Sequence, residues 1–276
     1  MANYVFSISA KVVRRVNFLR QAGTPPLEDR YVSQLFREVG IATTDISVQR
    51  ITNNVSGFKN FYYSIEATVG NERKRYFGSM PDRRVEPLEW TYCHLAGFKY
   101  RNPVERKGKD FRDLRKLAAN GIPAADPIAF DPQRGFVLEP FYDGVAMQTF
   151  FESNDYFEDT KLEKFMQGLV ILKKAHTIGV ECGEAFPENF LVKEDGQAIL
   201  TDAERESASR TPEKHELAAF VYSSARSLRP EAIIRRTREL YPVETLRELP
   251  RYNMRLLLNV DPFTLHQTNK AIKEVL

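Results

Sequence analysis

The sequence predicts an α+β protein of two lobes, a small lobe built on an antiparallel sheet with a helix and a larger lobe that is mainly helical. Strand-like segments rich in aromatic and β-branched residues come early, at 46–52, 61–69 and 75–80. A long apolar helical period comes later, at 162–178. We therefore divide the chain into an N-terminal helical extension (1–45), the small lobe (46–141) and the large lobe (142–276).

Composition sets the outer bounds on function. The chain has 276 residues, 42% hydrophobic and 28% charged, which is ordinary for a globular protein of one domain or two packed lobes. The formal net charge of +3 is too small to indicate a nucleic-acid partner. A local excess of Arg and Lys at 101–116 is interpreted as a solvated helix face.

Location and redox state follow from what the sequence lacks. It has neither an apolar run of membrane-spanning length nor an N-terminal signal pattern, so we expect a cytoplasmic protein without a transmembrane segment. The two cysteines, Cys93 and Cys182, predict neither a disulfide framework nor a zinc site. The four scattered histidines make a transition-metal centre improbable.

The extension and small lobe are predicted element by element. In the extension, Val32, Leu35, Phe36 and Val39 recur at helical spacing, so a helix should pack on the first lobe. A polar loop at 53–60 separates the first two strands, and a Gly-Asn turn precedes the third. Residues 85–99 then predict the small lobe's helix.

The connection and the large lobe follow. Residues 110–120 predict a short helix, and 127–130 and 136–139 predict strands. Helices are expected at 148–153 and 162–178, the second ending at a glycine, and the chain after residue 230 is predicted to be mostly helical.

A predicted hairpin carries the most informative residues. Two short β-like runs, 190–192 and 198–200, flank an Asp-Gly turn. Asn189 lies just before the first run and Asp202 just after the second, so the hairpin returns an amide oxygen and a carboxylate to the same end. Hard oxygen ligands of this kind suit a magnesium-phosphate complex.

The order of residues around this hairpin resembles the catalytic and metal loops of protein kinases and of their sugar, antibiotic and lipopolysaccharide kinase relatives. His176, Glu184, Asn189 and Asp202 stand at successive intervals of eight, five and thirteen residues, as in that family. The resemblance implies a kinase-like fold over roughly residues 46–230. It also implies ATP and Mg²⁺ as ligands, with Glu184 as the catalytic carboxylate and Asn189 and Asp202 as metal ligands.

The family pattern implies further roles for nucleotide-binding residues. Gly57 lies in the position of the phosphate-covering loop, and Lys59 in the same loop is a candidate phosphate contact. Glu89 suits the helix carboxylate that holds the family's strand lysine. Glu139 and Phe141 lie in the segment that resembles the adenine-binding hinge.

Several departures from the pattern weaken catalysis. Glu184 replaces an Asp with a stem one methylene longer, and Cys182 replaces the loop His. Ala203 removes the Phe that packs beside the metal carboxylate. The third strand has Gly78 or Ser79 where the lysine belongs. Lys59 and Lys74 are the substitutes within reach, though each is more typical of a plain surface lysine.

Three hypotheses follow. The first is a pseudokinase, a nucleotide-binding protein with a regulatory or partner-binding role. The second is an active atypical kinase that phosphorylates a hydroxyl of a glycan, lipopolysaccharide or other small molecule, with Glu184 as base. The third is a nucleotide-free interaction scaffold for a protein partner, whose function should survive substitution of Asn189 and Asp202.

Overall fold

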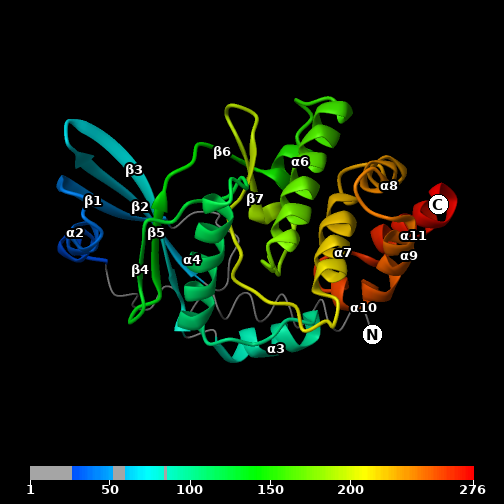
Figure 1. The fold of residues 1–276 in the computed structure, drawn as a ribbon, viewed down its shortest axis with the longest axis horizontal. Coiled ribbons are helices and arrows are strands. Elements are labelled where there is room, and N and C mark those ends of the chain that lie inside the picture. The colour runs from blue at the N-terminus through cyan, green and yellow to red at the C-terminus, as the bar shows by residue number, and fades with distance from the viewer. Residues whose placement is uncertain (1–26, 52–59, 84–85) are drawn as a thin grey trace.

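The computed structural model describes residues 27–51, 60–83 and 86–276. It is an α+β arrangement in which a small antiparallel sheet lies at one end and helices fill the other, as Figure 1 shows. The predicted fold class is therefore confirmed at this level. Most of the extension (1–45), the loop at 52–59 and residues 84–85 lie outside the described residues.

The five-stranded sheet has the order β1-β2-β3-β5-β4, and each neighbouring pair is antiparallel. The three early strands and the two connecting strands were all predicted, but the first three extend further than expected. Their bounds are β1 Thr43–Ile51, β2 Asn60–Val69, β3 Glu72–Pro81, β4 Ala129–Asp131 and β5 Phe136–Pro140.

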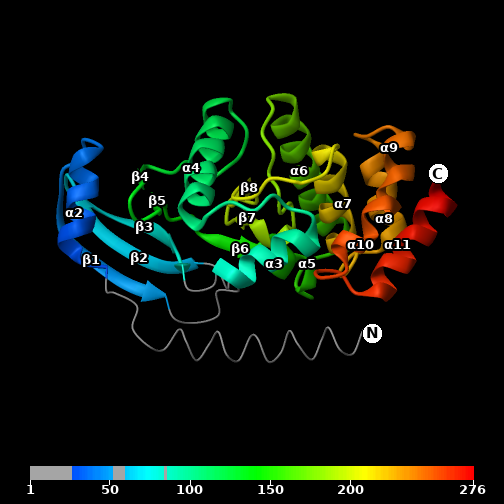
Figure 2. The same ribbon diagram turned by 90° about the horizontal axis from the view of Figure 1, so that it is seen from below.

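Helix α2 (Asp29–Glu38) covers the outer face of this sheet, as Figures 1 and 2 show. Its Val32 and Phe36 are fully buried against strand residues such as Ile65 and Phe136. This confirms the helix predicted in the extension, except that Val39 lies past its end and is exposed.

Gly78 of β3 is required by the packing of the sheet, because a Cβ atom at that position would lie 2.6 Å from the ring of Phe136.

Helix α4 (Pro103–Ala119) packs on the opposite face of the sheet, against β3, β4 and β5. The side chain of Asn102 caps its start by accepting a hydrogen bond from the backbone N–H of Glu105, and proline follows at the first helical position. The sequence predicted a helix only from residue 110, so α4 begins seven residues earlier.

Helix α3 (Glu86–Ala96) confirms the helix predicted at 85–99. It contacts α10 in the helical part of the molecule, whereas α4 packs on the strands. Of the two helices, α4 and not α3 therefore lies against the strands. Leu114 and Leu117 of α4 are buried in the core of the helical part, so this helix contacts both the strands and that core.

The helical part begins with a small three-stranded sheet of order β6-β7-β8 and continues into helices around one core. The predicted helices at 148–153 and 162–178 and the predicted hairpin are confirmed; β6 was not predicted. The bounds are β6 Gly144–Ala146, α5 Met147–Glu152, α6 Glu158–Thr177, η2 Pro187–Asn189, β7 Phe190–Lys193, β8 Ala198–Leu200, α7 Pro212–Ser224, α8 Pro230–Arg238, α9 Val243–Glu248, η3 Leu249–Tyr252, α10 Asn253–Leu256 and α11 Pro262–Val275.

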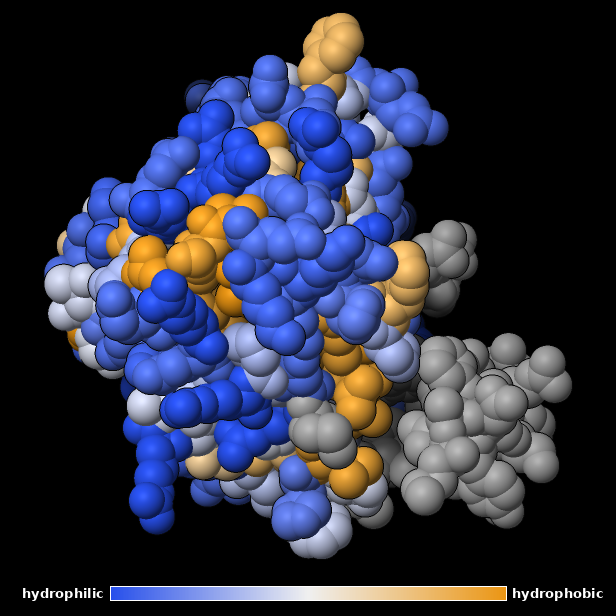
Figure 3. Space-filling model, turned by 90° about the vertical axis from the view of Figure 1, so that its right-hand side faces the viewer, coloured by the Kyte–Doolittle hydropathy of each residue, from blue (hydrophilic) through white to orange (hydrophobic). Residues whose placement is uncertain are grey.

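The core of the helical part positions the β7–β8 hairpin. The ring of Phe220 on α7 stacks on Phe165 of α6 and contacts Phe190 at the start of β7, and all three are fully buried. Figure 3 shows the face made by the C-terminal helices, where hydrophilic side chains surround smaller apolar areas. Among the described residues, no helix combines the length and apolar character needed to cross a membrane.

Candidate functional site

The β7–β8 hairpin brings Asn189 and Asp202 to the same end, as the sequence predicted. Phe190 pairs with Leu200, and Thr201 donates from its backbone N–H and its hydroxyl to the carbonyl of Asn189, at 2.9 and 3.0 Å. Asp202 follows directly. The amide Nδ2 of Asn189 donates to the carbonyl of Glu184 at 2.5 Å, so the oxygen of that amide remains available as a ligand.

A buried carboxylate on α7 holds the loop before this hairpin. Glu216 accepts hydrogen bonds from the backbone N–H groups of Cys182 and Gly183, at 3.1 and 2.8 Å, and its Oε2 lies 2.8 Å from Nε2 of His176. The side chain of Glu216 is completely inaccessible. The buried carboxylate of Glu216 therefore holds the loop that carries Glu184 in place.

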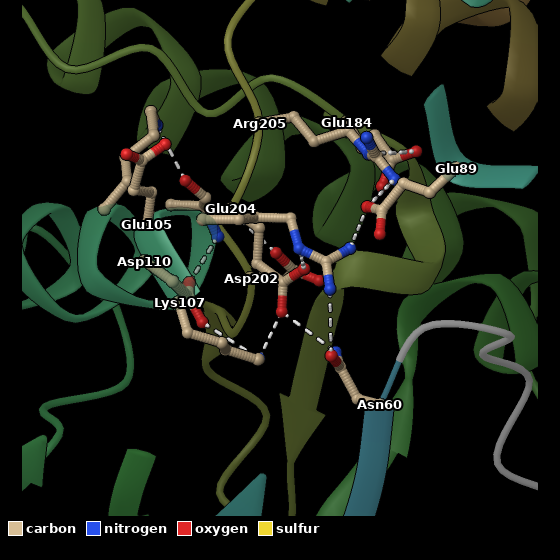
Figure 4. Close-up of polar contacts among 12 residues, drawn as sticks. Asn60, Glu89, Glu105, Lys107, Asp110, Glu184, Asp202, Glu204 and Arg205 are labelled. Carbon is tan, nitrogen blue, oxygen red and sulfur yellow. Dashed lines mark hydrogen bonds and ion pairs between the residues drawn. The ribbon is translucent and has the colours of Figure 1, made fainter. Parts of the chain in front are cut away.

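Three carboxylate groups lie close together at the candidate site. Asp110 of α4, Asp202 and Glu204 have oxygen atoms within 4.8 Å of one another, as Figure 4 shows. Burial, together with the negative charges of Glu204 and Asp110, raises the pKa of Asp202 to about 8, against the opposing effect of Lys107. Burial likewise raises the pKa of Asp110 to about 6. The concentration of negative charge suits a hard cation.

Two basic residues of α4 reach into this cluster from the sheet side. Arg106 forms an ion pair with Glu89, and its Nε lies 3.2 Å from Oε2 of Glu204. Lys107 forms an ion pair with Oε1 of Glu204 and lies 3.4 Å from Oδ2 of Asp110. Burial alone would lower the pKa of Lys107, but the neighbouring carboxylates outweigh it and raise that pKa.

A second pair of α4 residues ties the helix to the backbone of the loops. Lys109 donates to the carbonyls of Glu181 and Ala203, both at 2.7 Å. Asp110 accepts from the backbone N–H of Ala203 at 2.8 Å. The interpretation of residues 101–116 as a solvated face is therefore wrong for this turn of α4, because Arg106, Lys107 and Lys109 are all buried against fixed partners.

The predicted catalytic carboxylate has a buried cationic partner. Oε1 of Glu184 lies 3.0 Å from Nε of Arg205, and Glu184 is only 8% exposed. The same guanidinium lies 3.0 Å from Oε1 of Glu89 and donates to the sulfur of Cys93. Glu89, predicted to hold a strand lysine, lies instead between Arg106 and Arg205.

The predicted hinge residues differ in what they offer. The backbone N–H of Phe141 donates to the carbonyl of Arg75 at 3.1 Å, and its ring lies under that guanidinium. Pro140 has no N–H to give. The carboxyl group of Glu139 is buried, and its Oε2 has no hydrogen-bond partner within the described ranges. Burial raises the pKa of Glu139 to about 8.

The remaining predicted phosphate contacts are Gly57 and Lys59, with Lys74 as an alternative lysine. Gly57 and Lys59 lie outside the described residues. Lys74 pairs with Glu72 at the exposed end of the β2–β3 hairpin, whereas Ser79, at the other end of β3, is buried. Lys74 therefore does not replace the missing strand lysine.

Sequence reasoning missed Arg106, Lys107, Asp110 and Arg205. One signal could have found the α4 residues. Asp110 lies four residues before the buried Leu114, and Lys107 lies seven residues before it, so both continue the apolar stripe of the helix. Charged residues on a core-facing stripe need partners and therefore point to a site.

A scan against models of known protein families finds no match for this chain, and a search of curated proteins finds none either.

Proposed function

We propose that this chain is a kinase-like nucleotide-binding protein that takes ATP together with Mg²⁺ at the end of the β7–β8 hairpin, and that it has a regulatory or partner-binding role with inefficient phosphoryl transfer. The observation that carries the proposal is the placement of Asn189 and Asp202 at one end of the hairpin, beside two further carboxylates. Oxygen ligands and the phosphates of a nucleotide are the usual shell of Mg²⁺.

The charge balance of the cluster supports a bound cation. Within the described ranges, the carboxylates of Glu89, Asp110, Glu184, Asp202 and Glu204 outnumber the three cations that form ion pairs with them, which are Arg106, Lys107 and Arg205. Burial and, after it, the negative charges of Glu204 and Asp110 raise the pKa of Asp202, so this carboxyl group holds its proton to a higher pH than usual. A divalent ion at Asp202 would displace that proton and neutralise the excess.

The environment of Glu184 supports binding without efficient transfer. Phosphoryl transfer in kinases depends on positioning and on charge stabilisation, with a carboxylate oriented toward the attacking hydroxyl. Here Glu184 is buried against Arg205, so an acceptor hydroxyl would have to displace the guanidinium. Misplacement of a catalytic group by about 1 Å can cost on the order of a hundredfold in rate.

One observation favours an active atypical kinase acting on a glycan, lipopolysaccharide or other small-molecule hydroxyl. The side chain of Asn189 is bonded to the backbone carbonyl of Glu184, which fixes the metal ligand and the carboxylate as a unit. Such coupling serves catalysis directly, because both groups must keep their separation.

Titration of ATP into the purified chain by calorimetry, with and without Mg²⁺, tests the proposal. The account expects binding that requires Mg²⁺, and a ligand at a hundred times its dissociation constant should stabilise the fold by about 2.7 kcal/mol. Glu184→Gln should retain this binding. Turnover of ATP that disappears in Glu184→Gln would establish the active kinase, and absence of any binding would leave the nucleotide-free scaffold.

A further inference from the structure

The face of the sheet that carries Ser79 lacks a lysine on β3. Ser79 pairs with Tyr62 on β2 and Val137 on β5, and all three therefore share one face. Lys74 belongs to the distant end of the strand. Arg73 and Arg75 of β3 share the face of Ser79 but are paired with Glu66 and Asp143. A nucleotide bound at Asp202 would thus find no lysine on this face of β3.

Lys107 of α4 approaches that same space from the helix. Its side chain is only 4% exposed, and its ammonium group contacts Glu204 and Asp110. Its positive charge also acts on Tyr62 from the sheet and on Asp202 from the loop after β8. The ammonium therefore lies between the sheet and the proposed metal ligand, as Figure 4 shows for the helix and loop residues.

We propose that Lys107 contacts the phosphates of the bound nucleotide in place of the lysine that β3 does not carry, and that Glu204 positions its ammonium group when the site is empty. This inference rests on the proposed function, since it concerns the same nucleotide. A lysine ammonium has three N–H donors, and contacts with Glu204 and Asp110 use two of them. A third donor is left for a phosphate oxygen.

The electrostatics of the helix favour this role. Lys107 and Lys109 lie on the same turn of α4, but Lys109 is committed to two backbone carbonyls and to Asp113. Arg106 is directed to Glu89 and Glu204. Lys107 forms its ion pairs with Glu204 and Asp110, two carboxylates of the metal cluster, so a phosphate-bound Mg²⁺ would lie beside it.

The test compares the double variant Lys107→Met/Glu204→Gln with Glu204→Gln alone, because removing Lys107 by itself leaves a buried carboxylate without its cation. Calorimetry measures the affinity of each for ATP with Mg²⁺ and for adenosine. The loss of one charge-assisted hydrogen bond should weaken ATP about ten- to a hundredfold. The affinity for adenosine, which has no phosphate, should stay within about twofold by the same reasoning.

One control variant and two outcomes make the test decisive. Lys74→Met removes an exposed lysine from β3 and should leave both affinities unchanged. Equal ATP affinity in the double variant and in Glu204→Gln, with circular dichroism showing both folded, overturns the role of Lys107 while the proposed function stands. A wild-type chain that binds no ATP with Mg²⁺ overturns both.

Discussion

Nε of Arg205 lies 3.0 Å from Oε1 of Glu184, and both side chains are buried. The contact joins the loop before β7 to the segment after β8, the two segments that carry the candidate site. Its geometry is that of an ion pair and not of a linear hydrogen bond, because Nε of Arg205 has no hydrogen-bond acceptor among the described residues. The carboxylate of Glu184, which the sequence predicts to be catalytic, is therefore engaged in an ion pair.

Arg205→Met should destabilise the fold by about 3–5 kcal/mol, because it leaves Glu89 and Glu184 buried without their shared cation. Urea denaturation measures the change in unfolding free energy. Arg229→Met is the matched control, since that guanidinium is 72% exposed and solvent screens its pair with Glu158, so its loss should change the unfolding free energy far less. Equal changes in unfolding free energy for the two substitutions would show that the ion pairs of Arg205 do not stabilise the fold.

Gly183→Ala should disturb the candidate site, and Gly179→Ala should not. Both glycines have positive φ, +68° and +69°, so both substitutions incur similar backbone strain. At Gly183 a Cβ atom would also lie 2.4 Å from the carbonyl oxygen of Arg205, whereas nothing lies within 4 Å at Gly179. Magnesium-dependent ATP affinity should fall only in Gly183→Ala. An equal loss in both variants would attribute the effect to backbone strain alone.

His215 should make the fold sensitive to acid. Burial lowers its pKa from 6.5 to about 4, with a smaller effect from Arg255, so protonation is resisted in the folded chain. The unfolded chain binds this proton first, and stability is lost as the pH falls from 6.5 toward 4. Relative to His215→Phe, the wild type should lose about 2 kcal/mol between pH 7 and pH 4.5.

Urea denaturation of both chains at the two pH values measures this difference. His266→Gln, at an exposed position on α11, should show the pH dependence of the wild type. A parallel loss of stability in His215→Phe and the wild type would contradict the assignment.

Local patterns made the hairpin predictable. The Asp-Gly turn and its flanking apolar runs lie within a few residues of one another, so Asn189 and Asp202 could be placed at one end from sequence alone. The signals that predict the helix at 162–178 are also local, since its apolar period and its terminal glycine are contiguous in the sequence.

The charged half of the site could not be predicted in the same way. A lysine or arginine on a helix usually faces solvent, and it becomes buried only when a partner of opposite charge or a hydrogen-bond acceptor is present. Lys107 is paired with Glu204 and Lys109 with the carbonyl of Ala203, groups that lie more than ninety residues further along the chain. The same applies to Phe141, because its pairing with Arg75 follows from the sheet and not from the segment itself.

The most direct test of the central claim is the magnesium-dependent affinity for ATP in Asp202→Ala, measured by calorimetry beside Asp195→Ala. Asp195 lies at the exposed turn of the same hairpin and serves as the matched control. The account predicts that Asp202→Ala abolishes binding that requires Mg²⁺ and that Asp195→Ala retains it. Unchanged magnesium-dependent affinity in Asp202→Ala would contradict the site.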